Sequence, residues 1–184
     1  MHEVYDLTRV FVGHGLKMEF DRLKNLLMAL SVAITDHTNS SNEKLLEFRG
    51  EASAAVLQIG LYPSVSILEL SLALGLSHSA TVRLASKLEL RKLIDKKSGK
   101  DGREVELNLT SEGESMMRDI LQKRSDSFDK MIAPLGGDER QNLELYLSKI
   151  LGKVACDEND AIRICRMCDG RVCPDETCPV AYSS

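Results

Sequence analysis

The sequence predicts a mainly α-helical fold that contains one β-hairpin, and two observations support this prediction. Apolar residues recur every three or four positions over several long stretches, which is the spacing of amphipathic helices, and only 4 of the 184 residues are proline. Between two such stretches the period changes, because Val105, Leu107 and Leu109 alternate with polar residues as in a half-exposed strand. A chain of this length can form one core, or one core with a small appendage.

The N-terminal part of the chain is expected to form a long helix over residues 15–37. Its apolar residues follow helical spacing and include Leu16, Phe20, Leu23, Leu27, Leu30 and Ile34. The polar run DHTNSSN, at positions 36–42, is rich in turn and capping residues and should end this helix. A second helix is expected over 51–61, since Pro63 follows that stretch.

Two shorter helices joined by a tight turn are expected next. Ser66 and Glu69 have the spacing of a capping box, so a helix should begin directly after Ser66. Gly75 permits the turn that ends this helix, because glycine adopts left-handed backbone conformations at little cost. Ser77 can cap a further helix that extends to about Arg91. Two short helices joined by a glycine-containing turn form a helix-turn-helix unit.

A β-hairpin is predicted directly after this unit. Residues 93–97 and 105–109 are the expected strands, and the turn-rich sequence SGKDG lies between them. Helix, turn, helix and charged hairpin, in that order, predict a winged helix-turn-helix domain.

Two further helices should follow the hairpin. Ser111 and Glu114 have capping-box spacing and predict a helix that extends to about Met131. A last amphipathic helix is expected over 139–155, and its apolar face contains Leu143, Tyr146, Leu147, Ile150 and Leu151.

The second helix of the pair has the two faces that a DNA-reading helix needs. Four residues share the face expected to pack on the core, namely Ala80, Leu84, Ala85 and Leu88. The opposite face has small or polar residues that let a helix enter the major groove, and Arg83 can form a bidentate pair with guanine. The predicted DNA contacts are His78, Ser79, Val82, Arg83, Ser86 and Lys87 on the helix, and Lys97, Lys100 and Arg103 on the hairpin. A solvated polar helix face beside a solvated lysine-rich turn is the alternative explanation.

Charge is unevenly distributed along the chain. The formal net charge of −4 argues by itself against a nucleic-acid partner. However, positions 83–103 carry eight basic residues, opposed only by Glu89, Asp95 and Asp101. This basic block coincides with the predicted recognition helix and hairpin, where phosphate contacts would be made.

Four of the five cysteines lie in the last twenty residues and predict a metal site. Cys165, Cys168, Cys173 and Cys178 follow the spacing Cys-x2-Cys-x4-Cys-x4-Cys, and four thiolates can complete a tetrahedral zinc site. An iron–sulfur cluster is an alternative, because Cys173 and Cys178 each precede a proline. A thiol switch, or unliganded thiols on a loose tail, are further alternatives. Cys156 is expected on the last helix as a buried apolar residue.

Several short motifs in the centre of the chain occur together in one family. They are LS at the start of the second helix, R-L-x-x-x-L within it, D-G-R in the hairpin, and L-x-L-T-x-x-G after it. In these features the chain resembles the MarR family of bacterial transcription regulators. The tail pattern C-R-x-C-D…C-P…C-P-V resembles a subgroup that has a C-terminal cysteine cluster. Lys92 departs from the family pattern, since relatives often have glycine at this position.

The resemblance implies a homodimer whose N- and C-terminal helices form the dimer body. Each winged domain would then read half of a near-palindromic operator in double-stranded DNA. The resemblance also implies base contacts from His78, Ser79, Val82 and Arg83, and it places Asp101 and Arg103 in the wing. The implied segments are an N-terminal dimerisation region (1–40), the winged domain (41–113), C-terminal dimerisation helices (114–156) and the cysteine-rich tail (157–184).

The predicted function is therefore a DNA-binding transcription regulator, a homodimeric repressor with a zinc site, that responds to a small-molecule or redox effector. The alternatives are a metal- or redox-sensing protein in which the cysteine cluster controls DNA binding or partner contact, and an RNA-binding protein that acts through the tail. An enzyme is not expected, since the four histidines are scattered and no phosphate loop or nucleophile motif is found. The opening MHEVYDLTRV lacks the pattern of a secretory signal, and no apolar run approaches ~20 residues. A cytoplasmic protein without a membrane partner is expected.

Overall fold

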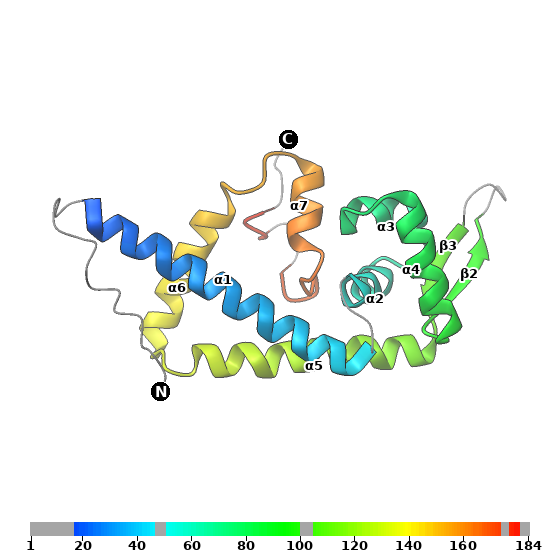
Figure 1. The fold of residues 1–184 in the computed structure, drawn as a ribbon, viewed down its shortest axis with the longest axis horizontal. Coiled ribbons are helices and arrows are strands. Elements are labelled where there is room, and N and C mark those ends of the chain that lie inside the picture. Colours follow the sequence, from blue (N-terminus) through cyan, green and yellow to red (C-terminus); the bar gives the residue numbers. More distant parts are fainter. Residues whose placement is uncertain (1–16, 47–50, 100–104, 174–176, 181–184) are drawn as a thin grey trace, which may run out of the picture. The chain divides into compact units, whose positions relative to one another are not determined.

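The computed structural model describes residues 17–46, 51–99, 105–173 and 177–180 (Figure 1). Contacts between residues group the chain into two compact units, Met1–His37 and Thr38–Ser184. The described residues are mainly helical, with one small antiparallel sheet, and this confirms the predicted fold class. Among them no helix has the length and hydropathy that a membrane span requires.

Helix α1 (Lys17–Leu46) continues well beyond residue 37, so its predicted end there is wrong. The run DHTNSSN contains neither glycine nor proline, and its residues disfavour a helix by less than about 1 kcal/mol each. Polar side chains in α1 also bond to its own backbone. Thr35 Oγ1 donates to the Ser31 carbonyl, and Ser31 Oγ to the Met28 carbonyl, each at 2.8 Å.

The middle of the chain forms the predicted winged helix-turn-helix domain. Its elements are α2 (Ala52–Leu61), β1 (Val65–Ser66), α3 (Ile67–Leu74), α4 (His78–Leu90), β2 (Ile94–Ser98) and β3 (Val105–Leu109). The strands pair antiparallel in the order β1-β3-β2 (Figure 1). Strand β1 was not predicted, because two residues are too few to show an alternating pattern. Val65 of β1 pairs with Leu107 of β3.

The core of this domain lies around α2, which packs against α3, β3 and the long helix α5 (Ser111–Ile132). Residues 52–59 are all buried, so no polar face is left on this helix. Gly60 permits the close approach of α5 and β3, since a Cβ there would overlap the sulfur of Met117 and the side chain of Leu109. The largest fully buried side chains are Leu57, Ile59, Leu70, Leu88, Ile94, Leu107 and Ile120.

Helix α5 (Ser111–Ile132) begins one residue earlier than the predicted cap implies. Thr110, rather than Ser111, is the N-cap, and its Oγ1 accepts from the Gly113 N–H at 3.1 Å. The same hydroxyl donates to the Lys92 carbonyl at 2.6 Å, so it also ties the helix start to the hairpin. A Cβ at Gly113 would overlap the Leu93 carbonyl oxygen, which explains why this position is glycine.

Helix α6 (Gly137–Leu151) starts and ends slightly before the predicted range of 139–155. Its N-terminus is held by Glu139, whose carboxylate accepts from the Gly136 N–H at 2.8 Å. Cys156 therefore lies beyond α6 and is exposed, so the prediction of a buried cysteine on the last helix is wrong. Six residues separate the end of α6 from the next helical segment, and five of them, Cys156 included, are exposed, so this cysteine does not enter a core.

A short helix that was not predicted, α7 (Glu158–Cys165), opens the cysteine-rich tail. Asp157 caps it by accepting from the Asp160 N–H at 2.8 Å. Helix α7 packs against α3, so the tail lies on the winged domain (Figure 1).

Candidate nucleic-acid interface and the cysteine-rich tail

Side-chain caps fix where α3 and α4 begin. The Glu69 N–H donates to Ser66 Oγ at 3.2 Å, and the Ser66 N–H donates to the Glu69 carboxylate at 2.8 Å, which confirms the predicted capping box. The hydrogen bond from the Ser66 backbone is the main reason that the pKa of Glu69 is lowered. Ser77 caps α4, since its Oγ accepts from the Ala80 N–H at 3.3 Å. The capping box therefore sets the start of α3, and the Ser77 cap sets the start of the predicted recognition helix.

The turn between the two helices depends on Gly75, whose φ of 65° is left-handed. Its N–H donates to the Leu72 carbonyl at 3.2 Å, and the next N–H, of Leu76, donates to the Ser71 carbonyl at 3.0 Å. Both bonds satisfy carbonyl groups that the end of α3 would otherwise leave free. The turn therefore sets the angle at which α4 leaves α3.

Helix α4 has one buried and one exposed face. Ala85 and Leu88 are buried and confirm the predicted core face, whereas Ala80 and Leu84 are half-buried. Thr81 is also buried, which was not predicted. Its hydroxyl donates to the Ser77 carbonyl at 3.1 Å, so a polar side chain is satisfied inside the core.

Most of the residues predicted to contact DNA lie on the opposite, exposed face of α4. His78 and Ser79 are exposed in its first turn, and Val82, Arg83 and Lys87 are exposed in the next two turns. This surface combines the guanidinium fork of Arg83 and the ammonium group of Lys87 with an imidazole, a hydroxyl group and the side chain of Val82. Such a surface fits the major groove and the donor and acceptor pattern of base edges.

Ser86 is held differently from the other predicted contacts. Its hydroxyl accepts from Lys96 Nζ at 3.1 Å, and the same ammonium group pairs with Glu89 at 2.7 Å. Lys96 therefore ties β2 to α4, although its sequence position marked it only as one of several basic residues. The sequence signal for this contact was a hydroxyl at Ser86 followed three residues later, on the same helix, by the carboxylate of Glu89, because the two groups together can bind one ammonium group.

The wing is described in its strands only. Lys97 is exposed on β2, which pairs with β3 from Ile94–Leu109 to Ser98–Val105. The predicted contacts Lys100 and Arg103 lie outside the described residues, as does Asp101.

Lys92 lies between α4 and the wing and has a φ of 59°, in the left-handed region that favours glycine. Where relatives often have glycine, this chain therefore has a lysine in the same left-handed backbone conformation. The backbone is held there by the Lys92 N–H, which donates to the Glu89 carbonyl at 2.8 Å.

In the cysteine-rich tail, Cys168 and Cys178 are both neighbours of Cys165. Burial raises the pKa of the Cys165 thiol to about 12, and the neighbouring thiols of Cys168 and Cys178 add to this rise. Cys168 is joined to Cys165 by a turn in which its N–H donates to the Cys165 carbonyl at 2.8 Å. The Cys173 N–H donates instead to the carbonyl of Asp169, at 3.2 Å. In the part of the chain that the structure describes, no three His, Cys, Asp or Glu side chains are arranged to hold a metal ion.

The two residues inside the Cys-x2-Cys turn are held by the winged domain and by α5. Gln58 Nε2 of α2 donates to the Arg166 carbonyl at 3.1 Å, and Arg124 of α5 donates to the Met167 carbonyl. The Arg166 guanidinium also lies 3.5 Å from the Glu51 carboxylate at the start of α2. These contacts seat the predicted metal-binding turn on the body of the domain.

These features define a winged helix-turn-helix protein with a C-terminal cysteine-rich segment. No family model matches the chain. The transcriptional repressor MprA of Escherichia coli K12 is 31% identical over 100 residues, which are 54% of this chain and 57% of that protein. The matched region thus spans little more than half the length of this relative.

Solved structures give the same result for the fold. YusO from Bacillus subtilis has a TM-score of 0.66 at 22% identity and covers 77% of this chain and 100% of that chain. A MarR family protein from Bacillus stearothermophilus has a TM-score of 0.63 at 17% identity, covering 74% and 96%. A mutant of MepR from Staphylococcus aureus, bound to an oligodeoxyribonucleotide, has a TM-score of 0.54 at 16% identity, covering 72% and 98%. The comparisons confirm the resemblance to MarR family regulators that the central motifs indicated.

Proposed function

We propose that this protein is a sequence-specific DNA-binding transcription regulator that acts as a homodimeric repressor. The observation that carries the proposal is the exposed face of α4, on which His78, Ser79, Val82, Arg83 and Lys87 lie opposite a buried apolar face. Among similar proteins, MprA is named a transcriptional repressor and the MepR mutant is bound to an oligodeoxyribonucleotide. Both names support a regulator rather than an enzyme.

Within this proposal the residues of α4 have different roles. Arg83 donates to a guanine edge, and Val82 contacts a thymine methyl group. Lys87 and Lys97, with Lys100 and Arg103, contact phosphates, which position the protein and make binding salt-dependent. Ser86 has a supporting role, because its hydroxyl already accepts from Lys96.

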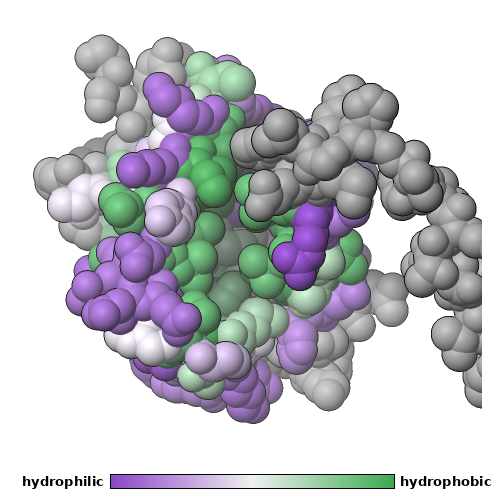
Figure 2. All heavy atoms as spheres, turned by 90° about the vertical axis from the view of Figure 1, so that its left-hand side faces the viewer, coloured by the Kyte–Doolittle hydropathy of each residue, from purple (hydrophilic) through white to green (hydrophobic). Residues whose placement is uncertain are grey.

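A second copy of this chain is the proposed partner of α6. Across the described residues this helix buries no side chain, and Leu145, Tyr146, Leu147 and Ile150 remain 42–57% exposed. Hydrophobic side chains are also visible at the surface beside hydrophilic ones (Figure 2). Apolar helix faces of this kind are usually covered by another surface. A two-fold dimer would place two recognition helices on the half-sites of a near-palindromic double-stranded operator.

The tail is proposed to bind zinc through Cys165, Cys168, Cys173 and Cys178. The Cys-x2-Cys turn, in which the Cys168 N–H donates to the Cys165 carbonyl at 2.8 Å, supports the proposal. Bound zinc would supply a structural cross-link in a segment that has almost no core. Because the turn is held by α2 and α5, the cross-link would stabilise the tail against the winged domain. An iron–sulfur cluster or a thiol switch on the same cysteines would make the tail a redox sensor, which is the second candidate function.

The DNA-binding proposal is tested by selecting a duplex from a random library with the full-length protein. Affinity for the selected duplex is then measured for Arg83→Ala and for Lys130→Ala, whose exposed cation lies on α5 outside the interface. We expect Arg83→Ala to weaken binding by about 1–3 kcal/mol and to relax the sequence preference, and Lys130→Ala to match the native protein. Selection of no sequence, or equal affinity of the two variants, would contradict the proposal.

The zinc proposal is tested by elemental analysis and a UV–visible spectrum of protein purified without oxygen. About one zinc per chain without visible absorption is expected for a four-thiolate site. Iron with visible absorption would support the cluster, and the absence of both metals would leave the thiol switch.

A further inference from the structure

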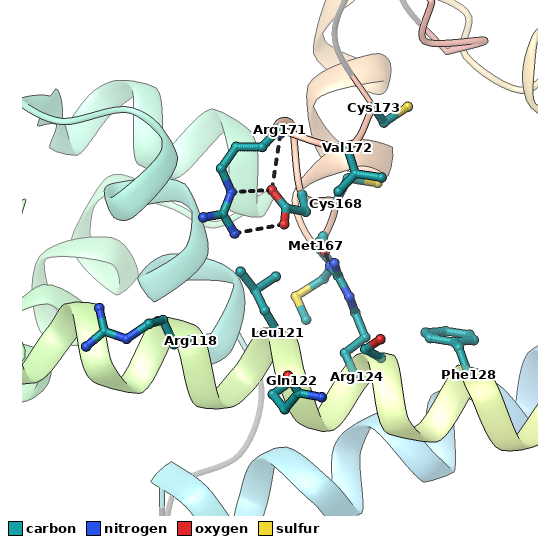
Figure 3. Close-up of a pocket in the computed structure, with 12 residues that line it drawn as sticks. Arg118, Leu121, Gln122, Arg124, Phe128, Met167, Cys168, Arg171, Val172 and Cys173 are labelled. Carbon is teal, nitrogen blue, oxygen red and sulfur yellow. Dashed lines mark hydrogen bonds and ion pairs between the residues drawn. The ribbon is translucent and has the colours of Figure 1, made fainter.

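Lys96 connects the wing to the recognition helix through two groups of that helix. Its ammonium group donates to Ser86 Oγ at 3.1 Å and lies 2.7 Å from a carboxylate oxygen of Glu89. Lys96 belongs to β2, whereas Ser86 and Glu89 belong to α4, which packs against that strand (Figure 1). By contrast, the ion pair of Arg171 with Asp169, drawn with dashed lines in Figure 3, joins residues two positions apart in the tail. The contacts of Lys96 therefore link two different elements of the winged domain.

The backbone of Lys96 is fixed by the sheet. Lys96 pairs with Leu107 of β3, whose side chain is fully buried. Side chains alternate between the two faces of a strand, so Ile94, which is also buried, shares a face with Lys96, and the exposed Lys97 lies on the other face. The side chain of Lys96 is 25% exposed. Its ammonium group therefore reaches Ser86 from the side of the sheet that faces the core.

The contact with Lys96 decides which part of the Ser86 hydroxyl group remains for a partner. An ammonium group is a donor only, so the Ser86 oxygen accepts from it with one of its lone pairs. The hydroxyl hydrogen cannot point at the ammonium group, and within the described part of the chain it donates to no other atom. A hydrogen bond accepted from a cation polarises the hydroxyl group and strengthens it as a donor. Ser86 therefore offers a hydrogen-bond donor to its surroundings.

Ser86 lies where this donor can reach a base edge. It is half-buried on α4 and shares a helix face with Val82 and Arg83, which precede it by four and three positions. In the major groove the keto oxygens of guanine and thymine accept hydrogen bonds, whereas the amino groups of adenine and cytosine donate them. A hydroxyl group that is held as a donor distinguishes keto from amino groups. A hydroxyl group that turns freely can donate or accept, so it makes no such distinction.

We propose that Lys96 is a positioning residue for base recognition, which holds the Ser86 hydroxyl as a donor to a keto oxygen, O6 of guanine or O4 of thymine. The inference rests on the proposed DNA-binding function and gives the supporting role of Ser86 a chemical form. Lys96 itself does not contact the DNA, because its charge is paired with Glu89. The two neighbouring lysines of β2 therefore differ in role, since Lys96 acts on sequence preference and Lys97 on phosphate binding.

The test is the affinity of the full-length protein for its selected duplex and for each single-base-pair variant of that duplex. We expect one base pair of each half-site at which guanine or thymine is preferred over adenine or cytosine, and at which Ser86→Ala lowers the preference about three- to tenfold, since one hydrogen bond is lost. Lys96→Met combined with Glu89→Gln should lower it about threefold at the same base pair. This pair of substitutions leaves no unpaired carboxylate and keeps the net charge, and methionine retains the apolar part of the lysine side chain.

A double-mutant cycle separates positioning from a general structural effect. In a protein that already carries Ser86→Ala, the substitutions of Lys96 and Glu89 should cause no further loss of preference, because their effect passes through the hydroxyl group. Glu89→Gln alone is the control, since its amide oxygen still accepts from Lys96 and the preference should remain. Circular dichroism confirms that each variant is folded. An equal loss of affinity for all duplexes, with or without Ser86→Ala, would show a merely structural role of Lys96 and overturn the proposal.

Other results separate this inference from the DNA-binding function on which it rests. If Arg83→Ala changes the sequence preference and Ser86→Ala does not, DNA binding stands and the inference fails. A uniform loss of affinity in Ser86→Ala would assign its hydroxyl group to a phosphate oxygen, and a lost preference for adenine or cytosine would show that the hydroxyl group accepts. Each of these two results would also overturn the inference. If the native protein selects no sequence, the proposed function and the inference fail together.

Discussion

The buried side-chain amide of Gln58 donates a hydrogen bond to the carbonyl oxygen of Arg166 at 3.1 Å. Gln58 lies in α2, at the centre of the winged domain, and Arg166 lies between Cys165 and Cys168. The Met167 carbonyl accepts in the same way from Arg124 of α5. The Cys-x2-Cys turn is therefore hydrogen-bonded to α2 and α5, the helices that support the recognition helix. A change in the conformation of this turn would act directly on those two hydrogen bonds.

Removal of the Gln58 amide should loosen the tail. We expect Gln58→Ala to lower the free energy of unfolding by about 1–2 kcal/mol, since one hydrogen bond and some buried packing are lost. Hydrogen exchange of residues 165–173 should become faster in the same variant. Gln122→Ala is the matched control, because Gln122 is exposed on α5 and, among the described residues, donates one local hydrogen bond, to Asp126. Unchanged exchange in Gln58→Ala would show that this hydrogen bond does not seat the tail.

Sequence patterns predicted the winged domain because its local and overall signals agree. The capping box of Ser66 and Glu69, the left-handed Gly75 and the cap at Ser77 are each decided by neighbouring residues. The seat of the tail was not predictable in this way. Gln58 and Arg166 are 108 positions apart, and an isolated glutamine in an apolar helix gives no indication of its partner.

In the N-terminal helix, a local sequence signal gave a wrong prediction. The polar run from Asp36 to Asn42 has the composition of a loop, yet it continues α1, since weak helix propensities are easily outweighed when glycine and proline are absent. The predicted start of α5 differs from the observed start by one residue, because Thr110 and Ser111 are both good N-caps. The choice between them depends on the Lys92 carbonyl, which is distant in sequence.

Replacement of Lys92 by glycine should stabilise the protein. Lys92 has a φ of 59°, and a residue with a side chain in this region costs on the order of 1 kcal/mol or more, part of which is offset by the greater entropy of an unfolded glycine. We expect Lys92→Gly to raise the free energy of unfolding by up to about 1 kcal/mol in urea titrations. Arg91→Gly is the control, since Arg91 has a φ of −86° and glycine there should destabilise. A loss of stability in Lys92→Gly would mean that its side chain contributes more than its strained backbone costs.

The capping box of α3 predicts a small dependence of stability on pH. The pKa of Glu69 is lowered in the folded protein, mainly by the hydrogen bond from the Ser66 backbone. Its contribution is therefore complete above the ordinary pKa of a glutamate and is lost as the pH falls through the lower, folded value. Because Glu69 is largely exposed, we expect well under about 1 kcal/mol.

The measurement for this prediction is the free energy of unfolding between about pH 3 and pH 6. Glu69→Gln should flatten part of the pH dependence in this window, whereas Glu144→Gln, on the exposed surface of α6, should not. If both variants follow the native curve, the capping box does not contribute through its charge.

Salt dependence should separate the phosphate contacts from the base contacts. Lys97 is exposed on β2, and we expect Lys97→Ala to weaken binding to all duplexes alike and to reduce the slope of log affinity against log salt by about 1. Arg83→Ala should instead change the sequence preference. Fluorescence anisotropy at several salt concentrations, on the selected duplex and a scrambled one, distinguishes the two. An unchanged slope in Lys97→Ala would remove the wing strand from the interface.

The apolar face of α6 predicts how the dimer should respond to a single charge. Leu147 is 42% exposed and Tyr146 is 57% exposed, so a glutamate at position 147 should be tolerated by the monomer but not by a dimer that buries this face. In a two-fold dimer the substitution acts twice, and about 1.5 kcal/mol per copy raises the dimer dissociation constant by roughly two orders of magnitude. Leu90→Glu is the control, since Leu90 is 84% exposed at the end of α4. Sedimentation equilibrium, with circular dichroism to confirm folding, measures the change. A native protein that is monomeric at micromolar concentration, or a Leu147→Glu dimer as tight as the control, would exclude α6 from the interface.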